Sequence, residues 1–336
     1  MKNKYIFFRT DRIGDFLLSA ILIKSIKRSD QNSFITVIAS KKNFEYIRNI
    51  DFIDEVIQFP NNYLYKIFFY LKFFLKKFYL VGILDGKKRS IYFSFFVRSK
   101  FKILFTYKRI YKEKFKYFFT DIFLDKNCND KISEILKLLN IIGLNLLNTD
   151  LNTINKDLVL KRSFTFPAQK KFTLLHLDEK WIFKDYIKSY QSIEPDNEEK
   201  FFLFLEKIIL KTNTDLFISS GFIDNKFTYF LKNKFSQISD NIYEFKVSNF
   251  KILFFDNLSF FELEKLILCS ECLITCHGAP SHVAASFNTK LIDIIDTSER
   301  IFFKKWTAHF RNYFPIFRIN FDKLSTQIID ELKFKE

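Results

Sequence analysis

The chain has 336 residues, of which 48% are hydrophobic and 27% charged, with a formal net charge of +16. This length suffices for two domains that each bury a core, and the hydrophobic fraction excludes a disordered chain. Lys and Arg interrupt the longest apolar runs, and no signal-peptide pattern follows Met1, so we expect a cytoplasmic protein without a transmembrane helix.

The positive charge is concentrated in the first half of the chain. Residues 1–160 contain 29 Lys and Arg against 15 Asp and Glu, whereas residues 161–336 contain 25 against 23. Residues 66–116 alone hold 15 basic residues against two acidic ones, interleaved with Phe and Tyr. Such a surface suits nucleic acid, an anionic membrane or an anionic substrate.

Short apolar runs alternate with longer amphipathic segments through the first half. Their periods predict strands at 4–9, 34–39, 53–59, 79–84 and 101–106, and helices at 15–28, 42–49, 62–77, 88–98 and 130–142. This alternation is typical of βα units around a parallel sheet. The stretch after residue 142 loses periodicity and is rich in Asn, Thr and Asp, which indicates a domain boundary.

The second half repeats the pattern. It predicts strands at 171–177, 215–220, 251–255, 272–276 and 290–295, and helices at 196–211, 225–234, 259–269 and from 281. We therefore expect an α/β protein with two Rossmann-like, doubly wound lobes, whose ligands bind beyond the carboxyl ends of the strands. The expected domains are 1–160, 165–320 and a C-terminal helix at 321–336.

The first candidate site is the stretch RTDRIGD, residues 9–15, where a strand turns into a helix at Gly14. The chain has neither a G-x-G-x-x-G fingerprint nor a Walker loop, which weakens a dehydrogenase or an NTPase. Asp15 falls at the helix start, where a carboxylate either caps the helix or serves as a general base, with Arg9 or Arg12 contacting an anionic group. Position alone leaves both roles open.

The second candidate site is LITCHGAPSHVAAS, residues 273–286, where an apolar strand turns into a helix. Backbone amides at such a helix start favour phosphate, and the histidines could add donors or be purely structural, as Ser281 could be purely an N-cap. The candidate residues are His277, Gly278, Ala279, Pro280, Ser281 and His282.

Two further predicted strands end in polar residues. In LHLDEKWIF, Lys180 could neutralise a diphosphate, or could be an exposed lysine beside a half-buried Trp181. In FISSGFIDN, the strand ends at Ser220 and Gly221, and Asp224 could accept a ribose hydroxyl or cap a helix.

Three cysteines, Cys269, Cys272 and Cys276, have a spacing that is compatible with a metal site. No second cluster of ligands accompanies them, so we expect buried, reduced thiols and no metal.

Taken in this order, the motifs resemble glycosyltransferase family 9, the lipopolysaccharide heptosyltransferase group. RTDRIGD resembles that family's R-x-D-R-[IL]-G-D, EKW its K-x-W or K-W element, and FISSGF its glycine-ended strand. Residues 258–295 resemble its longest shared block. The resemblance implies a GT-B architecture, in which two lobes face a central cleft, with the acceptor in the first lobe and a nucleotide sugar in the second.

The resemblance also implies an inverting, metal-independent transfer of sugar from an ADP-heptose-like or related donor to lipopolysaccharide or another cell-envelope glycan. The nucleotide sugar would be a co-substrate, and no other cofactor is expected. By motif match, Asp15 is the catalytic base, Lys180 contacts the diphosphate, and residues 278–282 bind phosphate. The other donor-site candidates are Ser220, Gly221, Asp224 and His277, and the acceptor-site candidates are Arg9, Arg12, Lys87 and Arg89.

The sequence departs from the family pattern in the last turn. The family usually has D-[ST]-G-x-x-H, whereas His277, Gly278 and Ala279 stand here, and Asp224 is offset by about one residue. The backbone amides survive this change, but the carboxylate and hydroxyl contacts do not. The sequence therefore leaves the donor open, and it also leaves open a non-catalytic relative that binds a nucleotide sugar or a lipid.

The acceptors implied by the resemblance are anionic lipid-linked saccharides at the cytoplasmic face of the inner membrane, so we expect peripheral contact with that membrane. The segment NYLYKIFFYLKFFLKKFYL, residues 62–80, suits either an interfacial helix or a core helix with snorkelling lysines. An RNA-binding protein is the remaining alternative. No recognised RNA module is present, so we expect no nucleic-acid partner.

Overall fold

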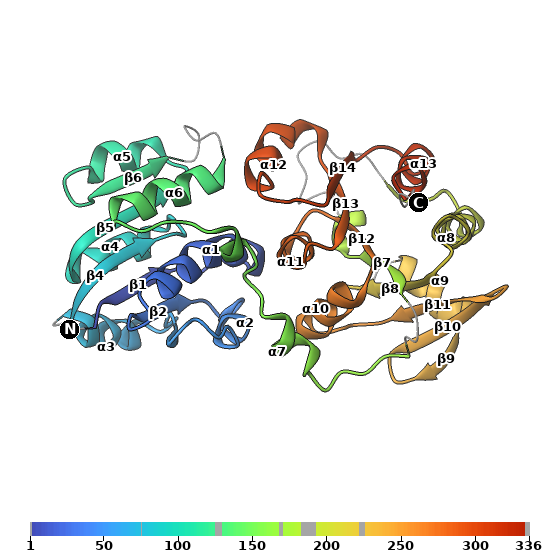
Figure 1. The fold of residues 1–336 in the computed structure, drawn as a ribbon, viewed down its shortest axis with the longest axis horizontal. Coiled ribbons are helices and arrows are strands. Elements are labelled where there is room, and N and C mark those ends of the chain that lie inside the picture. Colours follow the sequence, from blue (N-terminus) through green and yellow to red (C-terminus); the bar gives the residue numbers. More distant parts are fainter. Residues whose placement is uncertain are drawn as a thin grey trace. The chain divides into compact units, whose positions relative to one another are not determined.

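The structure is a computed structural model that describes residues 2–74, 76–124, 130–167, 171–182, 193–221 and 226–332. The chain forms two compact units, Met1–Asn155 and Lys156–Glu336 (Figure 1). The division lies before residue 160, the predicted boundary, because helix α7 (Lys156–Leu160) packs against α10 (Phe260–Cys269) of the second unit. No helix in the described part of the chain is long and apolar enough to cross a bilayer.

The first unit is built on a six-stranded sheet in the order β3-β2-β1-β4-β5-β6, in which every neighbouring pair is parallel. The strands are β1 (Lys4–Phe8), β2 (Phe34–Ala39), β3 (Glu55–Gln58), β4 (Lys77–Ile83), β5 (Arg98–Thr106) and β6 (Asp121–Leu124). The helices are α1 (Ile13–Ser29), α2 (Phe44–Arg48), α3 (Tyr63–Phe74), α4 (Lys88–Phe96), α5 (Arg109–Phe115) and α6 (Lys131–Ile141).

Alternate residues of these strands face two helical layers. Ile6 and Phe8 of β1 belong to the same buried cluster as Phe73 of α3, Phe93 of α4 and Phe115 of α5. Helices α3, α4 and α5 therefore cover one face of the sheet. On the other side, α1 and α6 contact each other. This two-sided covering is the reason why the central strands are continuous apolar runs.

The second unit has an eight-stranded sheet in the order β14-β13-β12-β7-β8-β11-β10-β9, which is parallel except for β9 and β10 at one edge. Its strands are β7 (Phe172–Leu177), β8 (Asp215–Ser220), β9 (Ser236–Ser239), β10 (Ile242–Val247), β11 (Phe250–Phe255), β12 (Cys272–Cys276), β13 (Lys290–Ile295) and β14 (Tyr313–Phe317). Besides α7 and α10, its helices are α8 (Glu198–Thr212), α9 (Lys226–Lys234), α11 (Ala279–Phe287), α12 (Arg300–Trp306) and α13 (Phe321–Glu331). Helices α8, α9 and α13 share one core with the sheet, and Trp181 is fully buried in it.

The predicted α/β class with two doubly wound, Rossmann-like lobes is confirmed. The helix predicted at 62–77 is wrong at its end, because Lys77 already begins β4. The helix expected from 281 begins at Ala279, with Pro280 in its first turn, where a missing N–H costs no hydrogen bond. The elements that the sequence pattern did not predict are α5, β6, α7, β9, β10, α12 and β14.

Candidate functional site

The first candidate site lies at the carboxyl ends of β1 and β4. These strands are neighbours, and the chain leaves them toward opposite edges of the sheet, so they form the topological switch point at which doubly wound folds bind ligands. The end of β1 continues into Arg9, Thr10 and Asp11, and the end of β4 into Asp85 and Lys87.

Arg9 is buried and holds this corner together. Its Nε and Nη2 donate to the Asp15 carbonyl oxygen at 3.0 and 2.7 Å, and Nη1 donates to the Leu84 carbonyl and to Asp11 Oδ2. These bonds occupy its guanidinium within the protein. Arg9, predicted to contact the acceptor, therefore positions the turn in this structure.

Asp15 is half-buried in the first turn of α1. Its Oδ2 accepts the Arg12 backbone N–H at 3.3 Å, so it caps the helix as the sequence allowed. One long hydrogen bond leaves most of the acceptor capacity of this carboxylate available, and the role of general base stays a prediction. The Arg12 side chain is exposed.

A second carboxylate, Asp11, shares the turn. Burial raises the pKa of Asp11 to about 6, against the opposing charge of Arg9, and Oδ1 is buried without a hydrogen-bond partner. A carboxyl group that changes charge near neutral pH suits acid–base chemistry. Sequence reasoning did not select Asp11, although it belongs to the same motif, because the motif match assigned the position of the base to Asp15.

Lys87 and Arg89, the other predicted acceptor residues, converge on Thr10. Lys87 Nζ donates to the Thr10 carbonyl at 2.7 Å, and Arg89 Nη2 donates to Thr10 Oγ1 at 2.8 Å. Arg89 Nε is buried without a partner. The structure thus brings both cations to the corner that holds Asp15. The buried Asp85 carboxylate accepts a hydrogen bond from Thr10 Oγ1 at 2.6 Å and so fixes the residue that both cations contact. Sequence reasoning missed Asp85.

The second candidate site lies at the corresponding switch point of the second unit, between β7 and β12. Lys180 follows β7, and its Nζ pairs with Asp178 Oδ2 at 2.6 Å and donates to the His277 carbonyl at 2.9 Å. Burial lowers the pKa of Lys180, but the neighbouring groups, Asp178 foremost, together raise it above its ordinary value. The ammonium group of Lys180 thus lies against the turn that starts α11.

Gly278 leaves room in that turn for Lys180, whose side chain approaches it closely. A Cβ atom at position 278 would collide with Lys180 Nζ. The buried Trp181 anchors the segment that carries Lys180 to β7, since its Nε1 donates to the His176 carbonyl at 2.9 Å. Arg318 Nη1 donates to the Lys180 carbonyl at 2.5 Å. These bonds therefore hold the EKW element so that the Lys180 ammonium group lies against the turn at Gly278.

His277 is held by Asp293, a fully buried carboxylate in β13. His277 Nδ1 lies 2.7 Å from Asp293 Oδ2, Ser281 Oγ donates to Oδ1 at 2.7 Å, and the Tyr313 hydroxyl lies 3.2 Å from Oδ2. Burial and then the Asp293 charge raise the pKa of Tyr313, which stays a neutral donor. Ser281 also accepts the Gly278 N–H at 3.2 Å and so caps α11.

The remaining donor-site predictions fall around the same strand ends. Ala279 and Pro280 form the first turn of α11, and the His282 ring lies 5.6 Å from the His277 ring. Ser220 Oγ donates to buried Asp256 at 3.2 Å, and Gly221 lies against Asp178 and Glu179. Asp224 lies outside the described residues.

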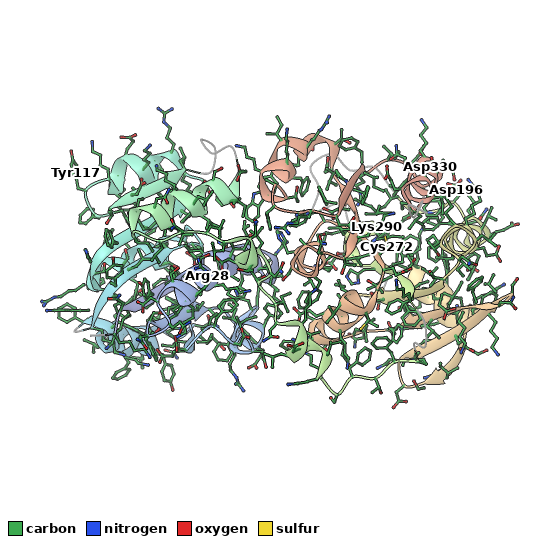
Figure 2. The ribbon with its side chains drawn as sticks, in the orientation of Figure 1. Arg28, Tyr117, Asp196, Cys272, Lys290 and Asp330 are labelled. Atoms are coloured by element: carbon green, nitrogen blue, oxygen red, sulfur yellow. The ribbon has the colours of Figure 1, made fainter. Side chains whose placement is uncertain are left out.

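Cys269, Cys272 and Cys276 are free thiols, and burial raises the pKa of Cys272 to about 12. Figure 2 shows Cys272 within the second unit. Among the residues that the structure describes, no three His, Cys, Asp or Glu side chains gather as metal ligands.

No protein-family model and no curated protein sequence matches this chain. Solved structures do match it over nearly its whole length. The glycosyl transferase family 9 protein from Veillonella parvula has a TM-score of 0.62 at 13% identity, with 100% of this chain and 93% of that chain covered. The E. coli ADP-heptose LPS heptosyltransferase II has a TM-score of 0.66 at 13% identity, covering 99% and 97%.

This chain has the fold of these glycosyltransferases. The E. coli heptosyltransferase WaaC with ADP is a third match, with a TM-score of 0.64 at 10% identity and coverage of 98% and 99%. A UDP-GlcNAc 2-epimerase from Methanocaldococcus jannaschii matches less closely, with a TM-score of 0.55 at 14% identity and coverage of 100% and 94%. The fold is therefore shared by proteins whose names give a nucleotide sugar as the substrate.

Proposed function

We propose that the protein is a glycosyltransferase that moves a sugar from a nucleotide-sugar donor to a cell-envelope glycan. The observation that carries the proposal is the pairing of the heptosyltransferase fold with a lysine held against the glycine turn before α11. Lys180 and the first amides of α11 would stabilise the negative charge that develops on a departing nucleoside diphosphate. An ADP-heptose-like sugar is one candidate donor.

The proposed reaction is a direct displacement with inversion that needs no metal ion. The acceptor hydroxyl attacks the anomeric carbon, its proton passes to the Asp15 carboxylate, and the bond between that carbon and the diphosphate oxygen breaks. Asp15 suits this role because its carboxylate keeps acceptor capacity at a strand-end corner. Arg89, with a buried and unpaired Nε, and Lys87 suit an anionic acceptor.

The acceptor proposed here is a lipopolysaccharide precursor or another anionic lipid-linked saccharide, which would place the protein at the cytoplasmic face of the inner membrane. The support is the net charge of residues 1–160, since cations near an anionic leaflet contribute about 1 kcal/mol each.

Replacing Asp15 with Asn tests the base. We expect sugar transfer to fall about a hundredfold or more, because a positioned base contributes roughly this factor, while the thermal shift caused by the nucleotide is unchanged. Asp11→Asn tests the other carboxylate of the same turn, and the assignment of Asp15 as the base predicts a smaller loss of transfer there than in the Asp15 variant. Persistent transfer by the Asp15 variant, or its loss in the Asp11 variant alone, would contradict the assignment.

A non-catalytic relative that binds a nucleotide sugar or a lipid is the second candidate. It is favoured by one observation, the presence of His277 where the resembled family usually has an aspartate. Nucleotide-dependent stabilisation without turnover of a panel of nucleotide sugars would support it. Epimerised donor, formed with no acceptor present, would point to the activity of the epimerase that shares the fold.

A further inference from the structure

Large hydrophobic side chains gather on the outer side of helices α3, α4 and α5. Among the described residues, 12 of the 22 exposed large hydrophobic side chains lie between Leu64 and Phe118. We define the outward face by six of them: Leu64, Phe68 and Leu71 of α3, Tyr92 and Phe96 of α4, and Tyr117 after α5. Figure 2 marks Tyr117 at the surface.

Helix α3 is apolar on both sides. Phe69 and Phe73 are buried against the sheet, whereas Leu64, Phe68 and Leu71 are 64%, 67% and 61% exposed. The spacing of these three residues, i, i+4 and i+7, places them in one stripe. A helix that is apolar all round is normally covered on every side, by protein or by lipid. Here the first unit covers only one side.

Aromatic contacts join the three helices into one continuous layer. The rings of Tyr70 in α3 and Phe96 in α4 lie 5.8 Å apart, and the rings of Phe95 in α4 and Phe118 after α5 lie 4.8 Å apart. The exposed apolar residues of neighbouring helices therefore belong to one surface. Scattered surface leucines need no partner, but a contiguous apolar surface marks an interaction site.

The charged residues around this layer are almost all cationic. Residues 66–116 carry 15 basic residues, and their two acidic residues are Asp85, which is buried, and Glu113. Lys72 of α3, Lys88 of α4 and Lys112 of α5 are exposed, and Lys72 Nζ lies 3.7 Å from Glu55 Oε1. Apolar side chains bordered by lysines match the acyl and headgroup layers of an anionic bilayer.

We propose that the outward face is a docking surface for an anionic lipid bilayer. A second copy of the chain fits less well, because an isologous contact would place the cationic segments opposite each other. Nucleic acid fits less well too, because the stripe has aliphatic Leu64 and Leu71 at both ends rather than a row of aromatic rings for base stacking. This inference names the membrane contact of the proposed function but does not depend on sugar transfer.

Sedimentation with vesicles tests the proposal on the full chain. We expect the protein to co-sediment with vesicles of phosphatidylglycerol and phosphatidylethanolamine, and much less with phosphatidylcholine alone. The triple variant Leu64→Gln, Phe68→Gln and Leu71→Gln should lower the partition coefficient at least about tenfold, because each side chain removed contributes apolar burial. Its unfolding transition should stay near that of the unaltered protein, since all three side chains are exposed.

Matched controls lie in the second unit. Leu203→Gln, Leu210→Gln and Ile301→Gln alter three exposed hydrophobic side chains there, and this triple variant should bind vesicles like the unaltered protein. A charge variant, Lys72→Gln, Lys88→Gln and Lys112→Gln, should also lose binding at least about tenfold, most clearly at low salt.

A reporter at position 68 gives a second readout. Tryptophan in Phe68→Trp should be quenched by brominated lipid, whereas tryptophan in Leu210→Trp should not. Equal binding by the α3 variant and the unaltered protein, or equal loss in the second-unit control, would overturn the proposal. So would self-association that the α3 variant abolishes while vesicles bind neither protein, or salt-sensitive RNA binding without vesicle binding. If vesicle binding holds and no sugar is transferred, only the proposed function fails.

Discussion

At the turn before α11, the absence of a side chain at Gly278 leaves space for the Lys180 side chain. Lys180 Nζ lies where a side chain at position 278 would lie, and it donates to the His277 carbonyl from there. Gly278 has an extended backbone that any residue can adopt, so its φ angle is not what requires glycine. The requirement comes from Lys180, which carries the charge proposed to face the diphosphate.

Gly278→Ala should therefore act through Lys180. The end of a lysine side chain is flexible, so we expect stability to change by less than about 1 kcal/mol while the ammonium group is displaced. ADP and UDP binding, followed by thermal shift, should weaken about tenfold, as in Lys180→Ala. The double variant should bind no more weakly than either single variant, because both changes remove the same contact. Additive losses would show that Gly278 acts independently.

At the scale of elements, a partly buried ion pair helps to fix the segment that leaves the first unit. Asp150, in the 3₁₀ turn Asn148–Leu151, is fully buried and accepts from Arg28 Nε at 2.9 Å and Ser25 Oγ at 3.0 Å, both on α1. It also accepts the Leu147 N–H at 2.9 Å. The Asp150 carboxylate thus helps to hold the aperiodic stretch after residue 142 to α1, together with Lys24 and Arg28, which donate to the carbonyls of Thr149 and Asn145.

Asp150→Ala should destabilise the first unit by about 2 kcal/mol, because it leaves donors on α1 and in the turn without their acceptor. The midpoint of denaturant unfolding measures this change. Asp51→Ala, which removes an exposed carboxylate bonded to Asn155, is the control and should change stability by less than about 0.5 kcal/mol. Equal effects of the two substitutions would mean that burial of the Asp150 carboxylate does not matter.

At the scale of the molecule, each unit has a sheet and a core of its own. The cluster that includes Trp181 lies wholly in the second unit, and the cluster that includes Phe93 lies wholly in the first. Each unit is also large enough to fold as an ordinary domain. The proposed donor site uses residues of the second unit alone.

Residues 156–336, produced alone, should therefore fold and bind nucleotide. We expect a cooperative unfolding transition that ADP or UDP raises, whereas residues 1–155 should fold without any nucleotide response. Far-ultraviolet circular dichroism checks folding, and thermal shift checks binding. A nucleotide response confined to the intact chain would show that the first unit completes the donor site.

The sequence by itself determined the elements that local pattern encodes. The bounds of β2, β8, β12 and β13 match the predicted strands, because buried parallel strands are short apolar runs that polar residues interrupt. It also marked the turns after β1, β7 and β12, which contain or lead into Asp15, Lys180 and Gly278. The edge strands β9 and β10 were missed because they are exposed or only partly buried, so little in their composition separates them from loops.

Only the tertiary structure decided which residues complete each site. In the sequence, Asp293 is a single charged residue within an apolar strand. Pairing of β12 with β13 brings its carboxylate to His277 and Ser281. Likewise, Asp85 meets Thr10 only because β1 pairs with β4 across 75 positions. Periodicity reports which side of an element is buried. Contacts between elements depend on strand order and register, which long-range packing sets.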